Sequence, residues 1–391
     1  MFKIQTLNNI AVAGLNRLPR DRYEVASEIA HPDAILVRSA NMHEIEIPST
    51  VKAIGRAGAG VNNIPVARLT GRGVAVFNAP GANANAVKEL VLAGMLLAAR
   101  NIGQAWRFAR ELEGDDEAIH KAVEAGKKQF VGLELPGRTL GVIGLGAIGV
   151  KVANVARALG MRVIGYDPTI TVQRAWQLES DVQPALSIDD LVSRADFISF
   201  HVPLTDETRH MINAERIRIM RPGAVLLNFS RDGIIDDAAA VEALDQGHLY
   251  AYVCDFPSNR LKDHPRVITL PHIGASTCEA EENCAVMVAD QIRDYLETGN
   301  VLNSVNFPEI QLPPNGGYRL AVVNSNVPNM LGQISTDLAQ AGLNILDMLN
   351  RSRGEVAVTL IDVDQPVPAN TATAIREIDG VLSVRCLGIG C

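Results

Sequence analysis

The stretch that decides the fold is "TLGVIGLGAIGVKVANVARALGMRVIGYD", residues 139–167. It begins with an apolar run that predicts a buried strand and continues through the turn GLGAIG. A helical pattern then runs to Gly160, and a second apolar run ends in Asp167, eighteen residues after Gly149. A strand, a glycine turn, a helix, a second strand and an acidic residue in this order predict a βαβ unit that binds a dinucleotide.

Each part of this unit has a physical task. Gly144 makes the turn, Gly146 lets the backbone approach a pyrophosphate, and Gly149 lets the helix pack closely on the strand. The first helical turn, with Ala147 and Ile148, would offer N–H donors and positive potential to the phosphates.

Asp167 predicts which dinucleotide is bound. Its carboxylate would accept hydrogen bonds from the adenosine ribose hydroxyls and repel a 2′-phosphate, which favours NAD over NADP. A structural glycine turn, with Asp167 only capping the segment DPT, is the alternative.

The alternation of apolar strands and helical segments continues on both sides of this stretch. Downstream, "ADFISFHVP", "GAVLLNFS", "LYAYVCDF" and "RVITLP" predict four more strands, six in all, in one doubly wound domain. Upstream, "AILVRSA", "VKAIGRAGAG" and "GVAVFNAP" predict βα units of a second parallel sheet, and "AVKELVLAGMLLAAR" predicts a buried helix. The fold class is therefore α/β with two doubly wound domains.

The last quarter of the chain predicts a different module. A helical pattern over residues 281–298 leads into the proline- and glycine-rich stretch "GNVLNSVNFPEIQLPPNGG". From Tyr318 the pattern is β, α, β, β, α, β, which predicts a small split-βαβ domain of the ferredoxin-like type.

Composition excludes several classes of function. A formal charge of -8 over 391 residues gives no reason to expect nucleic acid or an anionic membrane as a partner. The five cysteines are odd in number and lack CxxC spacing, so we expect no disulfide framework and no metal site. Without a signal-peptide pattern or an apolar helix long enough to span a bilayer, we expect a cytoplasmic protein.

Two polar residues follow strands of the dinucleotide domain. Arg231 comes after the fourth strand and His272 after the sixth, at the edge where such folds bind ligands. An arginine can hold a carboxylate through two hydrogen bonds, and a histidine can take a hydroxyl proton as hydride leaves the adjacent carbon. Taken singly, a loop ion pair for Arg231 and a strand cap for His272 are alternatives.

Six motifs together carry a family resemblance: "GRAGAGVNNI", "NAPGANANAVKEL", "LGVIGLGAIG", "HVPLTDETRHMI", "NFSRDGIID" and "PHIGAST". Over nearly its whole length the chain resembles the D-2-hydroxyacid dehydrogenase family. The resemblance implies a discontinuous substrate domain (residues 1–83 and 281–306), an NAD-binding domain (84–280), a linker (307–317) and a regulatory domain (318–391).

The resemblance also implies residue roles. Arg231 would anchor the substrate carboxylate and His272 would be the acid and base. Substrate would contact the amides of Ala57, Gly58 and Gly60, with Arg38 and Arg56 near its phosphate and Asn78 in the cleft. A solvated strand-end arginine is the alternative for Arg38. The remaining cofactor contacts implied are His201, Val202, Pro203, Thr208, Phe229, Ser230, Asp255 and Gly274.

One departure from the family pattern concerns the partner of His272. Most members have a glutamate about twenty-nine residues after the arginine, whereas this chain has Asn259 and Arg260 there. Lys262 is our candidate for the missing role, because the resemblance extends to short members of the family that use a lysine in this loop. A solvated loop lysine is the alternative.

The C-terminal module resembles an ACT domain, a sensor of small molecules. Asn326 and Asn344 match positions that bind L-serine between two paired domains, although Asn324 and Asn329 depart from the usual histidine and glycine. A domain that only dimerises is the alternative.

The whole resemblance implies the NAD-dependent oxidation of 3-phospho-D-glycerate that opens L-serine biosynthesis, in a homodimer or homotetramer. A glyoxylate or hydroxypyruvate reductase, or an NAD-sensing interaction protein without activity, remain alternatives.

Overall fold

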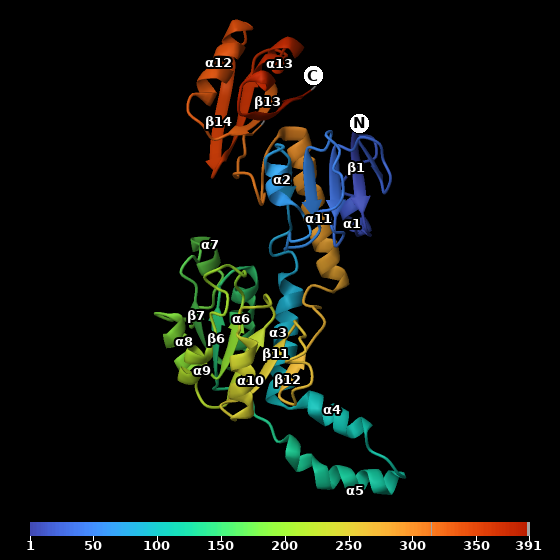
Figure 1. The fold of residues 1–391 in the computed structure, drawn as a ribbon, viewed down its shortest axis with the longest axis vertical. Coiled ribbons are helices and arrows are strands. Elements are labelled where there is room, and N and C mark those ends of the chain that lie inside the picture. Colours follow the sequence, from blue (N-terminus) through green and yellow to red (C-terminus); the bar gives the residue numbers. More distant parts are fainter. Residues whose placement is uncertain (314, 389–391) are drawn as a thin grey trace. The chain divides into compact units, whose positions relative to one another are not determined.

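The computed structural model describes residues 1–313 and 315–388 (Figure 1). Pro314, in the predicted linker, and residues 389–391, at the end of the predicted regulatory domain, lie outside the described part. The chain divides into two compact units, Met1–Asn83 with Cys278–Cys391, and Ala84–Thr277. The second unit is thus inserted between two segments of the first.

The inserted unit contains a seven-stranded sheet. Its strands are β6 (Thr139–Ile143), β7 (Arg162–Tyr166), β8 (Gln183–Pro184), β9 (Phe197–Phe200), β10 (Ala224–Asn228), β11 (Leu249–Cys254) and β12 (Val267–Thr269). Their order is β12-β11-β10-β9-β6-β7-β8, and every pairing is parallel. The order reverses between β6 and β9, and doubly wound sheets bind ligands beyond the carboxyl ends of the strands at such a point.

Helices cover both faces of this sheet, which explains why β6, β9 and β10 are buried along their whole length. The helices of the unit are α3 (Ala84–Ala99), α4 (Ile102–Arg110), α5 (Asp116–Gly126), the 3-10 helix η1 (Lys127–Phe130), α6 (Ala147–Ala158), α7 (Val172–Ala175), α8 (Ile188–Arg194), α9 (Ala214–Ile219) and α10 (Asp237–Asp245). The predicted buried helix is α3, which packs with α6 on one face, while α8, α9 and α10 pack on the other. Helices α4 and α5 bury no residue and extend away from the sheet (Figure 1).

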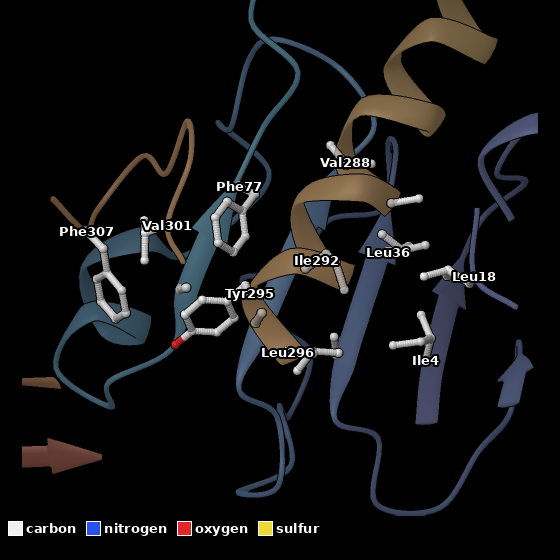
Figure 2. Packing of buried hydrophobic residues seen from close by; sticks show 14 of the residues in the cluster. Ile4, Leu18, Leu36, Phe77, Val288, Ile292, Tyr295, Leu296, Val301 and Phe307 are labelled. Atoms are coloured by element: carbon white, nitrogen blue, oxygen red, sulfur yellow. The ribbon is translucent and has the colours of Figure 1, made fainter. Parts of the chain in front are cut away.

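The other unit begins with a five-stranded parallel sheet. Its elements are β1 (Phe2–Leu7), α1 (Val12–Leu15), β2 (Tyr23–Ala26), β3 (Ala34–Val37), β4 (Ala53–Arg56), α2 (Val66–Thr70), β5 (Ala75–Phe77) and, from far along the chain, α11 (Cys278–Thr298). The strand order is β2-β1-β3-β4-β5. Figure 2 shows Ile292 and Tyr295 of α11 among side chains of the sheet, and the rings of Tyr295 and Phe77 lie 5.4 Å apart. Helix α11 therefore completes the core of the N-terminal sheet.

The same unit ends in an antiparallel four-stranded sheet. Its elements are β13 (Tyr318–Ser325), α12 (Met330–Gln340), β14 (Ile345–Arg353), β15 (Val356–Val363), α13 (Ala369–Glu377) and β16 (Val381–Leu387). The order β14-β15-β13-β16 is that of the ferredoxin-like fold. One face packs on α12 and α13, and residues of the other, such as Leu360, join the core that includes Val301 and Phe307.

The predicted fold class is confirmed, with three differences in detail. The sheet of the inserted unit has a seventh strand, β8, which is two exposed residues long and so leaves no apolar run in the sequence. The N-terminal sheet gains β1 and β2 beside the three strands that the pattern indicated. Helix α11 starts three residues before the predicted position.

Within residues 1–313 and 315–388, no helix has the length and apolar character needed to cross a membrane. The same residues contain no group of three or more histidine, cysteine or acidic side chains arranged to hold a metal ion.

Candidate active site

The glycine turn lies between β6 and α6, and its three glycines have different surroundings. Gly144 has φ +90°, and a Cβ there would lie 2.5 Å from the carbonyl oxygen of His201. A Cβ on Gly149 would overlap the carbonyl oxygen of Gly144. Nothing lies within 4 Å of a Cβ placed on Gly146. The turn therefore leaves open space above Gly146, at the start of α6, where a pyrophosphate would lie.

Asp167 is positioned at the mouth of this turn. Its Oδ2 accepts a hydrogen bond of 2.8 Å from the N–H of Leu145, and its Oδ1 accepts one of 2.9 Å from the N–H of Thr169. The acid thus lies directly beside the glycine turn, at the end of β7. The open space over Gly146, the N-terminus of α6 and this carboxylate fit the diphosphate and ribose of NAD, so these residues can hold that cofactor.

The segment after β9 forms a second wall of the same edge. Thr208 closes its loop by donating from Oγ1 to the carbonyl of Pro203 at 2.6 Å. The Nε2 of His201 is paired with Ser199 Oγ at 2.8 Å, while its buried Nδ1 has no partner among the described residues. Burial lowers the pKa of His201 to about 3, so this imidazole is neutral near pH 7.

The loop that carries Arg231 is shaped by the last residue of β10. Asn228 accepts from the N–H and the hydroxyl of Ser230 at 3.2 and 3.0 Å. It also donates from Nδ2 to the carbonyl of Arg231 at 2.9 Å. Phe229 is buried against α3, close to Gly94. The half-buried Arg231 is therefore presented at the carboxyl end of β10 by a fixed backbone.

His272 lies past β12 in a left-handed backbone conformation, with φ +55°. Non-glycine residues rarely adopt this conformation, so it must be stabilised by its surroundings. Asp255, which is 1% exposed, accepts from the N–H of Ile273 at 2.9 Å and from the N–H of Gly274 at 2.7 Å. Its carbonyl accepts from the N–H of His272 at 3.1 Å. Asp255 thus fixes the turn that exposes the imidazole.

The imidazole itself has an aromatic neighbour. Its ring meets Phe256 edge-on, with centroids 5.1 Å apart. In the described part of the chain no carboxylate hydrogen-bonds to it. Lys262 is exposed, and no contact between it and His272 is seen; its N–H donates to Ser258. The structure thus does not bring Lys262 to the histidine.

A carboxylate does reach the loop that contains Phe256. Ser258 donates to Asp237 Oδ2 at 3.2 Å, and burial, aided by the nearby Asp232 and Asp236, raises the pKa of Asp237. Asp237 therefore binds the loop next to His272 and not the imidazole ring.

The other unit presents the two candidate phosphate-binding arginines. Arg38 follows β3 and Arg56 ends the neighbouring parallel strand β4, so both lie at one edge of the N-terminal sheet. Arg38 Nη2 donates to Glu281 Oε1 at 2.5 Å, and Arg56 Nε donates to the carbonyl of Arg38 at 3.1 Å. Cys284 lies close to this group, and burial raises the pKa of its thiol.

The glycine loop after β4 is held to its neighbours through backbone groups. The N–H of Ala57 donates to Val37 at 2.8 Å, and the carbonyl of Gly58 accepts from Ala79 at 2.9 Å. The Arg56 side chain lies directly over Gly58, where a Cβ would overlap it. Asn78 donates to the carbonyl of Ala59 at 2.5 Å, beside Gly60. The structure thus brings all six predicted substrate residues together.

The two candidate effector residues lie apart within one chain. Asn326 donates to the carbonyl of Gly354, just before β15, whereas Asn344 receives a hydrogen bond on its carbonyl from Asp364 and donates its N–H to the same residue, just after β15. The eight-residue strand β15 separates them.

Sequence reasoning missed several residues of these sites. Asn228 had a local signal, an asparagine two residues before a serine at a strand end. Glu281 had none, because 243 residues separate it from Arg38. Asp255 was predicted as a cofactor contact, and its hydrogen bonds to the His272 turn emerged only from the fold.

Comparisons with known proteins agree with this geometry. Residues 92–274 match the family model for the NAD-binding domain of D-isomer specific 2-hydroxyacid dehydrogenases. The chain is 39% identical over 352 residues to D-3-phosphoglycerate dehydrogenase of Methanocaldococcus jannaschii, which covers 87% of this chain and 63% of the relative. It is 33% identical over 355 residues to D-3-phosphoglycerate dehydrogenase of Haemophilus influenzae, covering 88% of this chain and 83% of the relative.

A solved structure of NAD⁺-bound 3-phosphoglycerate dehydrogenase from Entamoeba histolytica has a TM-score of 0.60 and 27% identity, covering 78% of this chain and 98% of that one. The chain spans 63% of the Methanocaldococcus relative and only 50% of another curated relative. The glycine turn, the acid beside it and these similarities lead to one conclusion: the chain belongs to the D-isomer specific 2-hydroxyacid dehydrogenase family and carries its NAD-binding domain.

Proposed function

We propose that the protein oxidises 3-phospho-D-glycerate at C2 to 3-phosphohydroxypyruvate, the first step of L-serine biosynthesis. The observation that carries this proposal is the exposed His272, which Asp255 fixes at the same sheet edge as Arg231 and the dinucleotide turn. Arg38 and Arg56, side by side in an acidic protein, support a phosphorylated substrate.

Each residue has a defined task in this reaction. Arg231 binds the substrate carboxylate through its planar guanidinium, which fixes the orientation of C2. His272 takes the proton of the C2 hydroxyl as the C2–H bond breaks and the C=O bond forms. Bound NAD supplies the acceptor for the hydride. Lys262 remains our candidate for orienting the substrate or relaying the proton through water, while His272 accepts it.

One observation favours a second candidate, a glyoxylate or hydroxypyruvate reductase. Arg38 is already paired with Glu281, which lowers the positive charge available to a substrate phosphate. An unphosphorylated 2-oxo acid would not need a phosphate contact with Arg38.

The decisive experiment measures reduction of NAD and of NADP with a panel of D-2-hydroxy acids, with and without a terminal phosphate. We expect 3-phospho-D-glycerate to give the highest kcat/KM and NAD to be strongly preferred. A higher kcat/KM for D-glycerate or glycolate would favour the second candidate. Absence of turnover with the entire panel would favour an NAD-sensing interaction protein.

We also propose L-serine as an effector of the C-terminal module. In one chain Asn326 and Asn344 lie at opposite ends of β15, which supports a serine site shared by two copies and hence a homodimer or homotetramer. Calorimetric titration with L-serine should show binding that Asn344→Ala removes. If serine does not bind, or binds this variant equally well, we would conclude that the module serves only in assembly.

The cysteines support a cytosolic location. Among the described residues, Cys254, Cys278 and Cys284 form no disulfide, as expected in a reducing compartment.

A further inference from the structure

The ion pair between Arg38 and Glu281 lies at the edge of the N-terminal sheet where the substrate phosphate is proposed to bind. The pair is 2.5 Å long, and its side chains are 37% and 38% exposed. Water and small anions can therefore reach both partners. Glu281 comes from the first turns of α11, whereas Arg38 follows β3, so only the tertiary fold brings them together.

Several charges act on the same small volume. Arg56 is tied to Arg38 through the backbone, with Nε donating to the Arg38 carbonyl at 3.1 Å. One turn along α11 from Glu281, the thiol of Cys284 is close enough to be influenced by Arg56, Arg38 and Glu281. Two guanidinium groups and one carboxylate thus form a cluster with a net charge of about +1 at neutral pH.

The carboxylate of Glu281 occupies the kind of position that a phosphate oxygen takes. Guanidinium groups bind carboxylate and phosphate oxygens with the same N–H donors and at similar distances. A phosphorylated substrate must therefore displace Glu281 from Arg38 or bind beside its negative charge. A substrate without phosphate leaves the ion pair intact.

We propose that Glu281 is a specificity-determining residue, an internal anion that competes with the substrate phosphate for Arg38. This inference rests on the proposed function, which places the phosphate at Arg38 and Arg56. Glu281 lowers the preference of the site for phosphorylated over unphosphorylated 2-hydroxy acids.

The test replaces Glu281 by an isosteric neutral side chain. In Glu281→Gln, the ratio of kcat/KM for 3-phospho-D-glycerate to that for D-glycerate should rise roughly twofold to fivefold, the factor that corresponds to a partly exposed ion pair. The matched control is Glu282→Gln, which removes the same charge from the next, exposed position of α11. Its ratio should change by less than about 1.5-fold, because Glu282 is exposed and solvent screens its charge.

Two results would overturn the proposal. A lower ratio in Glu281→Gln would mean that Glu281 orients Arg38 for the phosphate, and an unchanged ratio would mean that the pair has no influence on selectivity. In an Arg38→Ala background, Glu281→Gln should have no further effect on the ratio, because the guanidinium for which Glu281 and the phosphate compete is absent.

Calorimetry with inorganic phosphate separates this inference from the proposed function. Phosphate should bind Glu281→Gln more tightly than the unmodified protein by a similar factor, whether or not any hydroxy acid is turned over. Tighter binding without turnover of 3-phospho-D-glycerate would reject the function and keep the role of Glu281. Equal or weaker phosphate binding by Glu281→Gln would reject the role of Glu281 alone.

Discussion

His272 is positioned through its backbone, not through its ring. Asp255 accepts from the N–H groups of Ile273 and Gly274, the two residues after His272. These bonds hold His272 in a left-handed conformation that an isolated histidine would rarely adopt. Phe256 meets the imidazole edge-on and restricts its rotation. A rigid turn and an aromatic contact thereby orient the ring, which has no hydrogen-bonded carboxylate partner among residues 1–313 and 315–388.

His272→Ala should lower kcat by about 10²–10⁴-fold, the range for loss of a general base. Lys262→Ala should also lower kcat, by less, and leave the affinity for NAD nearly unchanged if the lysine relays the proton. Steady-state kinetics with the best substrate and a separate NAD titration measure both effects. If Lys262→Ala has the kcat of the unmodified protein while Asn259→Ala or Asp263→Ala has a much lower kcat, one of those two neighbours relays the proton.

The half-buried His201, whose Nδ1 is buried, predicts a loss of stability in acid. Burial lowers its pKa to about 3 in the folded state, while the unfolded chain binds a proton near pH 6.5. The unfolded state is therefore favoured increasingly as the pH falls from about 6.5 towards 3. Between pH 7 and pH 5 this group should remove about 2 kcal/mol from the free energy of unfolding. Urea unfolding should show this loss reduced in His201→Gln, and an equal loss in both proteins would contradict it.

At the scale of an element, the glycines of the turn between β6 and α6 have different roles, one in cofactor binding and another in folding. The three glycines share one short segment, yet a side chain would meet open space at Gly146 and backbone at Gly149. The same substitution should therefore give different results at the two positions.

Gly146→Ala should weaken NAD binding by tenfold or more, about 1.4 kcal/mol, while the free energy of unfolding without cofactor changes by less than about 1 kcal/mol. Gly149→Ala should instead destabilise the fold, because its methyl group overlaps the Gly144 carbonyl. NAD titration by fluorescence and chemical unfolding of both variants give the comparison. Normal NAD affinity in a folded Gly146→Ala protein would mean that the pyrophosphate does not bind at this position.

At the scale of the whole molecule, a buried arginine joins the C-terminal module to the N-terminal sheet domain. Arg319 of β13 makes a bidentate pair with Asp362 of β15 at 2.6 and 2.7 Å. Its other donors bind the carbonyls of Thr298, Leu312 and Pro313, at the end of α11 and in the segment that follows. All five N–H donors of the guanidinium are thus used. Arg385 adds a second link, stacked 4.0 Å over the ring of Tyr295.

Arg319→Met should lower the free energy of unfolding by about 3–5 kcal/mol, because it leaves the carboxylate of Asp362 buried without a partner. The double variant Arg319→Met/Asp362→Leu should recover most of this loss, since it removes both charges. Chemical unfolding followed by circular dichroism measures both. A single variant within about 1 kcal/mol of the unmodified protein would mean that the pair does not fasten the module.

The sequence by itself determined the architecture, because its signals are local. The glycine turn with Asp167, the apolar strands between helices and the βαββαβ pattern each depend on residues close together in the chain, and all three appear in the structure. The positions of Arg231 and His272 at strand ends also followed from this pattern, since parallel strands place their carboxyl ends at one edge.

Only the tertiary structure decided how the site residues are partnered. The pairs Arg38–Glu281 and Arg319–Asp362 join positions far apart in sequence, as does the contact of Tyr295 with Phe77. Short elements such as β8 lack periodicity, so pairing alone defines them. The orientation of His272 also depends on tertiary structure, because Asp255 reaches the His272 turn only after β11 and β12 lie side by side. Local sequence encodes periodicity and turn chemistry, whereas the partner of a charge is fixed by which strands and helices become neighbours.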